Sequence, residues 1–138
     1  MEQNFKNHTR LNPPFHFFAV PATLIGLGFS IYKFTDQQDL TSALIICGFI
    51  LLGFALAFAR MYALKAQDRA IRAEEKLRYF ILTNKMLPSQ LRMGQIIALR
   101  FASDEEFVSL TERTIAENLS SKEIKMAIKN WKADYNRV

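Results

Sequence analysis

Two apolar runs dominate the first half of the chain. The first extends from Phe15 to Phe34 and the second from Leu40 to Ala59, and neither has a charged residue in its middle. A helix of about twenty residues is about 30 Å long, which is the thickness of the hydrocarbon layer of a membrane. Because lipid offers no hydrogen bonds to the backbone, both runs are predicted to be transmembrane helices.

Only five polar residues, 35–39, separate the two runs, so the predicted helices form a tight hairpin. Pro21, about one turn into the first run, is expected to kink its helix. Small side chains four residues apart would let these helices pack closely, or would let one face dock onto another membrane subunit. The predicted packing residues are Ala22, Gly26 and Ser30 on the first run and Gly53 and Ala57 on the second.

The charges beside the two runs are unequally distributed. The turn contains Asp36 and Asp39, whereas the other ends of both runs are flanked by basic residues. Since basic flanks stay in the cytoplasm, both termini are predicted to be cytoplasmic and the turn to face outward. These flanks also explain most of the net charge of +5, which would otherwise suggest nucleic-acid binding. The flanking basic residues are Lys6, Arg10, Arg60, Lys65, Arg69, Arg72, Lys76 and Arg78.

The second half of the chain is predicted to be a small helical domain in the cytoplasm. No glycine or proline occurs between Arg60 and Leu87, so the second helix is expected to continue to about Leu82 as a charged stalk. Its apolar residues Leu64, Ile71, Leu77 and Ile81 form a seam that is patchy for a coiled coil. The predicted fold is all-α, with a cytoplasmic segment (1–14), a transmembrane hairpin (15–59) and a cytoplasmic stalk with helical domain (60–138).

Three shorter helices are predicted after the stalk. The first extends from Pro88, a residue suited to a first helical turn, to about Ala102. The second and third each follow a capping box, which begins at Ser103 in one case and at Ser120 in the other.

The final predicted helix has an apolar stripe and a basic face. The stripe consists of Ile124, Ile128, Trp131 and Tyr135. The basic face is either an ordinary solvated surface or a surface that binds anions, such as lipid headgroups, an acidic protein or RNA phosphates. The predicted basic interaction face consists of Lys122, Lys125, Lys129 and Lys132.

No catalytic, cofactor-binding or metal site is predicted. His8 and His16 have no cysteine or carboxylate at ligand spacing, and Cys47 lies inside an apolar run. The runs have no ionisable group in their middle, which argues against a transport pathway. The last two predicted helices could resemble a helix-turn-helix, but their charges nearly balance, so DNA binding is not expected.

Four segments of the chain suggest a relationship: 4–8 (NFKNH), 63–70 (ALKAQDRA), 94–106 (GQIIALRFASDEE) and 128–134 (IKNWKAD). They resemble an uncharacterised family of short two-span membrane proteins from Bacteroidota-type bacteria. The resemblance covers the whole chain and implies a bacterial inner membrane with the two spans described above. It implies no activity and no site residues.

These features together favour a non-enzymatic accessory subunit or adaptor. Its hairpin would dock onto a larger inner-membrane complex, and its basic domain would contact an acidic cytoplasmic partner or the lipid surface. Two alternatives stay open. One is a membrane protein that self-associates through its stalk, and the other is a membrane-tethered protein close to the ribosome or to RNA.

Overall fold

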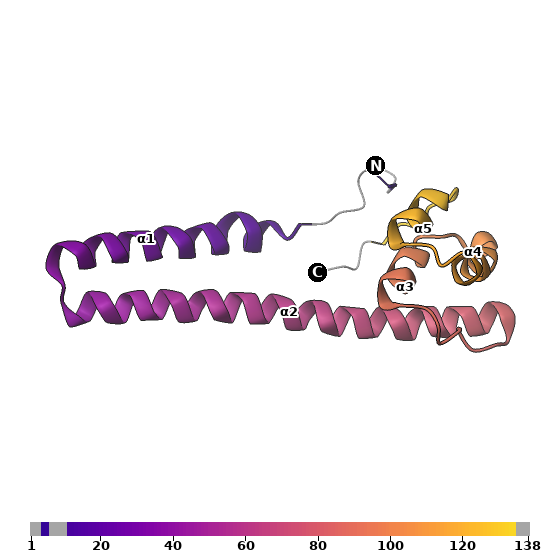
Figure 1. Cartoon of the computed structure of the whole chain (residues 1–138), viewed down its shortest axis with the longest axis horizontal. Coiled ribbons are helices and arrows are strands. Elements are labelled where there is room, and N and C mark those ends of the chain that lie inside the picture. The colour runs from indigo at the N-terminus through magenta and orange to yellow at the C-terminus, as the bar shows by residue number, and fades with distance from the viewer. Residues whose placement is uncertain (1–3, 6–10, 135–138) are drawn as a thin grey trace. The chain divides into compact units, whose positions relative to one another are not determined.

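The computed structural model describes residues 4–5 and 11–134, and all regular elements among them are helices (Figure 1). The chain divides into two compact units, one formed by Arg10–Leu64 and the other by Lys65–Val138 with Met1–Thr9. The all-α prediction is therefore confirmed for the described residues. Lys6, His8, Arg10 and Tyr135, which entered the predictions, lie outside them.

The first unit contains the π-helical turn η1 (Pro14–Ala19), helix α1 (Val20–Gln37) and the beginning of α2 (Leu40–Thr83). The turn between α1 and α2 is shorter than the predicted five residues, because α1 continues through Gln37. Gln38 ends α1 in the left-handed conformation with a φ angle of 30°, and its N–H donates to the carbonyl group of Phe34. Asp39 then caps α2, since its carboxylate accepts the N–H of Ser42 at 3.0 Å.

Proline explains the π-helical turn at the beginning of the first apolar run. The N–H of Val20 donates to the carbonyl group of Phe15, five residues earlier. Pro21 follows directly, in the first turn of α1. A proline ring collides with the carbonyl group four residues before it, and a wider turn at this place relieves that collision.

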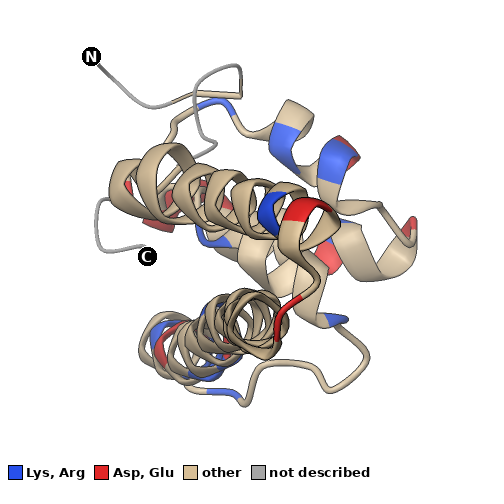
Figure 2. Ribbon diagram, turned by 90° about the vertical axis from the view of Figure 1, so that its left-hand side faces the viewer, with Lys and Arg blue, Asp and Glu red and all other residues tan. Residues whose placement is uncertain are grey.

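Both apolar runs belong to helices that are long and apolar enough to cross a membrane, Pro14–Gln37 and Leu40–Thr83. In each, only 6% of the most apolar stretch is buried within the protein. Figure 2 shows the ribbon of α1 without charged residues until its last turns. The predicted continuation of the second helix to about Leu82 is confirmed, because α2 ends at Thr83.

Two contacts join α1 and η1 to the first part of α2. The ring of Phe49 occupies the space where a side chain on Gly26 would lie. The guanidinium carbon of Arg60 lies 5.9 Å from the ring centre of Phe15. Both pairs are centred on the same point of the chain, between residues 37 and 38, as expected for antiparallel helices joined by a short turn.

The five predicted packing residues are not equivalent in the structure. Gly26 and Ser30 are half-buried, and the hydroxyl group of Ser30 donates to the carbonyl group of Gly26 at 2.7 Å. Gly53 is half-buried too, but no atom lies within 4 Å of the position that a Cβ would take there. Ala22 and Ala57 are exposed. Of the two predicted glycines, only Gly26 therefore lies against a side chain of the other helix.

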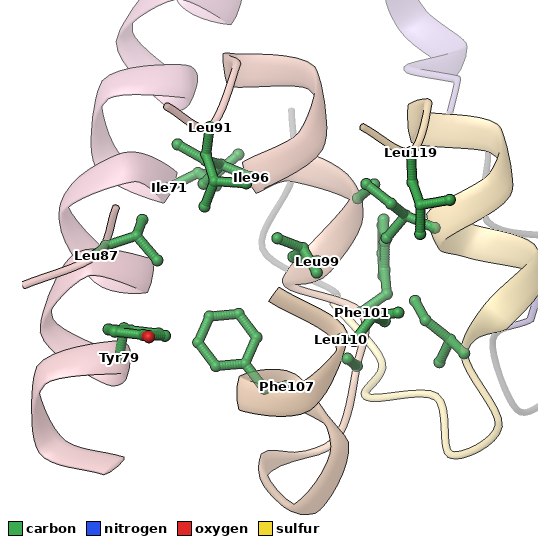
Figure 3. Packing of buried hydrophobic residues seen from close by; sticks show 14 residues of the cluster. Ile71, Tyr79, Leu87, Leu91, Ile96, Leu99, Phe101, Phe107, Leu110 and Leu119 are labelled. Atoms are coloured by element: carbon green, nitrogen blue, oxygen red, sulfur yellow. The ribbon is translucent and has the colours of Figure 1, made fainter. Parts of the chain in front are cut away.

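The second unit contains the end of α2, α3 (Met93–Leu99), α4 (Asp104–Ala116) and α5 (Ser121–Ala127). Figure 3 shows apolar side chains from all these helices meeting in one core. The ring centres of Tyr79 and Phe107 are 6.2 Å apart. Helices α3 and α5 pack closely at Gly94. A Cβ atom added at this glycine would lie only 2.9 Å from the hydroxyl oxygen of Ser121. The core residues are Ile71, Tyr79, Leu87, Leu91, Ile96, Ala98, Leu99, Phe101, Ala102, Phe107, Leu110, Leu119, Ile124 and Ile128.

The prediction that a helix begins at Pro88 is wrong, because α3 begins at Met93. Arg92 is extended and caps this helix, and its N–H donates to the side chain of Gln95 at 2.8 Å. The amide group of Gln95 also donates to the carbonyl group of Leu119 at 2.8 Å. A buried side chain that joins two segments so far apart fixes the beginning of α3 in place of the local signal at Pro88.

The two predicted capping boxes have different outcomes. At Ser120 the box forms, since Ser120 and Glu123 exchange hydrogen bonds of 2.7 and 3.3 Å between side chain and backbone. At Ser103 the helix begins as predicted, but the serine side chain makes no capping hydrogen bond. The Glu106 carboxylate accepts the N–H groups of residues 129 and 130 instead, at 3.2 and 2.8 Å.

The predicted final helix is too long, because α5 ends at Ala127 and Ile128 is extended. The two N–H groups held by Glu106 and an antiparallel bridge between Ala102 and Trp131 draw the following backbone away from a helical path. The N–H of Lys132 also donates to the carbonyl group of Phe101 at 2.7 Å. Ile128 and Trp131 still pack against the core, but not as the stripe of a helix.

Substitution at Gly26 tests the contact between α1 and α2. Gly26→Ala should destabilise the protein by about 1 to 3 kcal/mol, because the new methyl group collides with the ring of Phe49. Gly28→Ala is the matched control. Nothing lies within 4 Å of that position, so the control should gain up to about 1 kcal/mol from its higher helix propensity. Thermal unfolding in mild detergent measures both, and equal midpoints would contradict the contact.

Candidate functional site

An open groove of about 620 Å³ lies in the second unit between the end of α2 and residues 132–134. Charged side chains line one part of it and apolar side chains of α2 line another. Because this groove gathers most of the buried charge of the unit, it is the candidate functional site. Its lining residues are Gln67, Ala70, Ile71, Glu74, Glu75, Leu77, Arg78, Ile81, Leu82, Arg100, Asp104, Lys132, Ala133 and Asp134.

Arg78 is the centre of the charged part of the groove. Its guanidinium group donates to the Asp104 carboxylate at 2.6 and 2.7 Å and to the Glu75 carboxylate at 3.2 Å. It also donates to the carbonyl group of Ala102 at 2.7 Å, and it lies 4.2 Å from the ring centre of Phe107. These contacts attach α2 to the connection between α3 and α4, and they satisfy most of the donors of the guanidinium group.

Glu75 is a buried carboxylate on the inner face of α2. Its side chain is 11% exposed, and burial raises its pKa above the ordinary value of 4.5, although the neighbouring Arg78 acts in the opposite direction. Asp104 differs because its side chain is 57% exposed, and the hydrogen bond from Arg78 lowers its pKa. The two carboxylates that share Arg78 therefore have pKa values shifted in opposite directions.

A second ion pair, between Arg100 and Asp134, also lines the groove. Arg100, which is buried, contacts the carboxylate of Asp134 at 2.9 Å, and its guanidinium carbon lies 4.9 Å from the ring centre of Phe101. The ring of Trp131 lies 5.2 Å from the ring of Phe101. Residues 131–134 are thus held by both aromatic and ionic contacts.

The four predicted basic residues do not share one helix face. Lys122 and Lys125 lie on α5, whereas Lys129 and Lys132 lie beyond its end. The ammonium group of Lys125 lies 5.9 Å from the ring centre of Phe101, and Lys132 lines the groove beside two carboxylates. The prediction that helical spacing aligns these lysines is wrong, because α5 ends at Ala127.

The chemistry of the groove is that of a structural ion-pair network. Its arginines are engaged by carboxylates and backbone carbonyl groups, and such contacts hold side chains still. Within residues 4–5 and 11–134, no group of three His, Cys, Asp or Glu side chains is placed to bind a metal ion. Cys47 lies far from the groove in sequence, in the apolar part of α2.

Sequence reasoning missed the roles of Glu75 and Arg78, because it counted Arg78 among the basic residues that flank the spans and assigned no role to Glu75. The missed signal is the spacing of Ile71, Glu75, Arg78 and Tyr79, which places all four on one helical face. Two apolar residues at such positions indicate a buried face, so the charges between them needed partners.

Removal of the guanidinium group tests its role in holding the unit together. Arg78→Met should destabilise the second unit by about 3 to 5 kcal/mol, because it leaves the buried Glu75 carboxylate without its partner. Arg113→Met is the matched control, since the side chain of Arg113 is 54% exposed and forms an ion pair with the exposed side chain of Glu117. The control should change stability by about 1 kcal/mol or less. Urea unfolding of the full chain compares them, and similar midpoints would refute this role.

The opposite pKa shifts predict opposite effects of pH. A raised carboxyl pKa means that the folded state holds the proton more tightly, so this contribution to stability is present at acid pH and is lost as pH rises above about 4.5. Glu75→Gln should therefore flatten the fall in stability above that pH. Asp104→Asn should instead remove stability that is present above about pH 3.8 and is lost in acid. Thermal unfolding between pH 2 and pH 8 measures both effects, and identical pH profiles for the two variants would contradict the assignment.

Comparison with known proteins gives a family but no activity. No curated protein matches the chain, and no solved structure matches it. One family model, described as a family of unknown function, matches residues 1–138. The chain therefore belongs to this family, DUF6526.

Proposed function

We propose that this protein is a non-enzymatic accessory subunit of a bacterial inner membrane, anchored by a helical hairpin and carrying a small cytoplasmic helical domain. The observation that carries the proposal is the exposure of its two apolar helices, each only 6% buried along its most apolar stretch. The partners would be membrane lipid and the subunits of a larger membrane complex.

Lipid explains the exposed apolar surface better than water does. Soluble proteins rarely expose contiguous apolar patches above a few hundred Å², and here large apolar side chains are exposed along both helices. A core helix of a soluble protein would bury one face. The exposed residues include Phe17, Phe18, Leu24, Ile25, Phe29, Leu40, Leu44, Leu51, Leu52 and Phe54.

The charges support a single orientation of the hairpin. The turn side carries Asp36 and Asp39, whereas Arg60, Lys65 and Arg69 follow the apolar part of α2. Basic residues beside a span are retained in the cytoplasm, so the second unit would be cytoplasmic.

An accessory role fits the chemistry of the second unit. Its buried charged groups are committed to holding helices together, with Arg78 contacting two carboxylates and a backbone carbonyl group. Such a unit offers a stable surface for another protein. The exposed Ala22 and Ala57 and the open positions at Gly28 and Gly48 leave small-residue surfaces to which another membrane helix could pack.

Cysteine labelling tests the proposed orientation. Cys47 is the only cysteine, so Cys47→Ser gives a background without thiols. In it, Gln37→Cys should react with a membrane-impermeant maleimide in intact cells, whereas Lys85→Cys should react only after the membrane is opened. Both variants should stay in the membrane after an alkaline wash. Release by that wash, or the reverse labelling pattern, would contradict the anchor.

Purification at native expression level tests the accessory role. A tagged chain extracted in mild detergent should be recovered with other membrane proteins, identified by mass spectrometry and absent from an untagged control. Gly26→Ala serves as a variant with a disturbed hairpin and should recover less of them. Recovery of this chain without any other membrane protein would contradict the accessory role, while the anchor would stand.

A further inference from the structure

One face of α2 in the second unit is apolar and exposed. Ala66, Ala70, Ala73, Leu77 and Phe80 follow one another at intervals of four, three, four and three residues. All five are exposed, Leu77 by 60% and Phe80 by 45%. The buried residues Ile71 and Glu75 are on the other side of the same helix. We name this exposed face the alanine–leucine seam.

The spacing of the seam is that of a coiled coil. Alternating intervals of three and four residues place side chains along the line where two parallel helices meet. In heptad terms, Ala70 and Leu77 occupy a positions, and Ala66, Ala73 and Phe80 occupy d positions. This seam shares Leu77 with the patchy seam of the sequence analysis, but it does not include Ile71, which is buried in the core.

Charged residues beside the seam favour a second copy of the same helix as its partner. Arg69 occupies a g position and Glu74 the following e position, five residues later. In a parallel pair of identical helices, the g residue of one lies beside that e residue of the other. Two attractive pairs would form, one on each side of the seam. Neither residue belongs to an ion pair within the described part of the chain.

The orientation follows from the membrane anchor, so this inference rests on the proposed function. Two copies inserted in the same direction carry parallel α2 helices. The seam covers only about two heptads, which is short for a soluble coiled coil. Confinement to one membrane raises the effective concentration of a second copy and offsets this shortness. We propose that a second copy of this chain docks in parallel on the alanine–leucine seam, paired through Arg69 and Glu74.

Disulfide formation at the seam tests the proposal. In the Cys47→Ser background, Ala66→Cys, Ala70→Cys and Ala73→Cys are oxidised in native membranes. Each should form about fivefold more disulfide dimer than Arg72→Cys, an exposed control outside the seam, because a disulfide requires Cα atoms within about 7 Å. Dimers at only one of the three positions would indicate an antiparallel pair and overturn the proposal. A disulfide to a heavier protein of another kind would overturn it too.

Charge reversal tests the pairing itself. With Ala70→Cys as the reporter, Arg69→Glu or Glu74→Arg alone should lower the dimer yield by about fivefold, because attraction becomes repulsion on both sides. Combining the two reversals should restore the yield. Failure of this restoration would contradict the pairing. An alkaline wash of the same membranes reports on the anchor separately, so membrane-retained chains that form no seam dimer overturn the docking but not the proposed function.

Discussion

The guanidinium group of Arg78 joins the long helix to the short helices that follow it. It contacts Asp104, Glu75 and the carbonyl group of Ala102, and it lies over the ring of Phe107. Apolar packing from α2 into this core comes mainly from Ile71 and Tyr79, which alone would tolerate sliding of one surface over the other. Directional hydrogen bonds to a backbone carbonyl group and two carboxylates permit one register. The position of α4 therefore depends on a charge that lies on the same helical face as the buried residues Ile71 and Tyr79.

Local patterns were sufficient for the long elements. The two apolar runs predicted helices that the structure contains, and the absence of glycine and proline after Arg60 predicted the continuation of α2 to Thr83. The box at Ser120 was predictable because both its partners lie within four residues. In each of these cases, neighbours in the sequence supply the interaction that decides the structure.

Contacts between residues distant in sequence determine the helix bounds and the groove that the local patterns did not predict. Gln95 fixes the beginning of α3 by donating a hydrogen bond to the carbonyl group of Leu119. The Glu106 carboxylate accepts the N–H groups of residues 129 and 130, beyond the end of α5. The four lysines do not share one helix face for the same reason, since Lys129 and Lys132 follow the end of α5. The groove around Arg78 was hidden because a list of basic flanking residues does not distinguish a charge that faces solvent from one that faces the core.

Residues 128–134, which follow the end of α5, lie over the core in place of a further helical turn. They supply Ile128 to the core, a ring beside Phe101, the bridge to Ala102 and the carboxylate that pairs with Arg100. Helices α3 and α4 thus complete their packing only with a segment made after both of them. Synthesis on the ribosome proceeds from the other end, so the domain closes late in translation. A protease that cuts after Ala127 would also uncover the Phe101 ring and leave the buried Arg100 without its carboxylate.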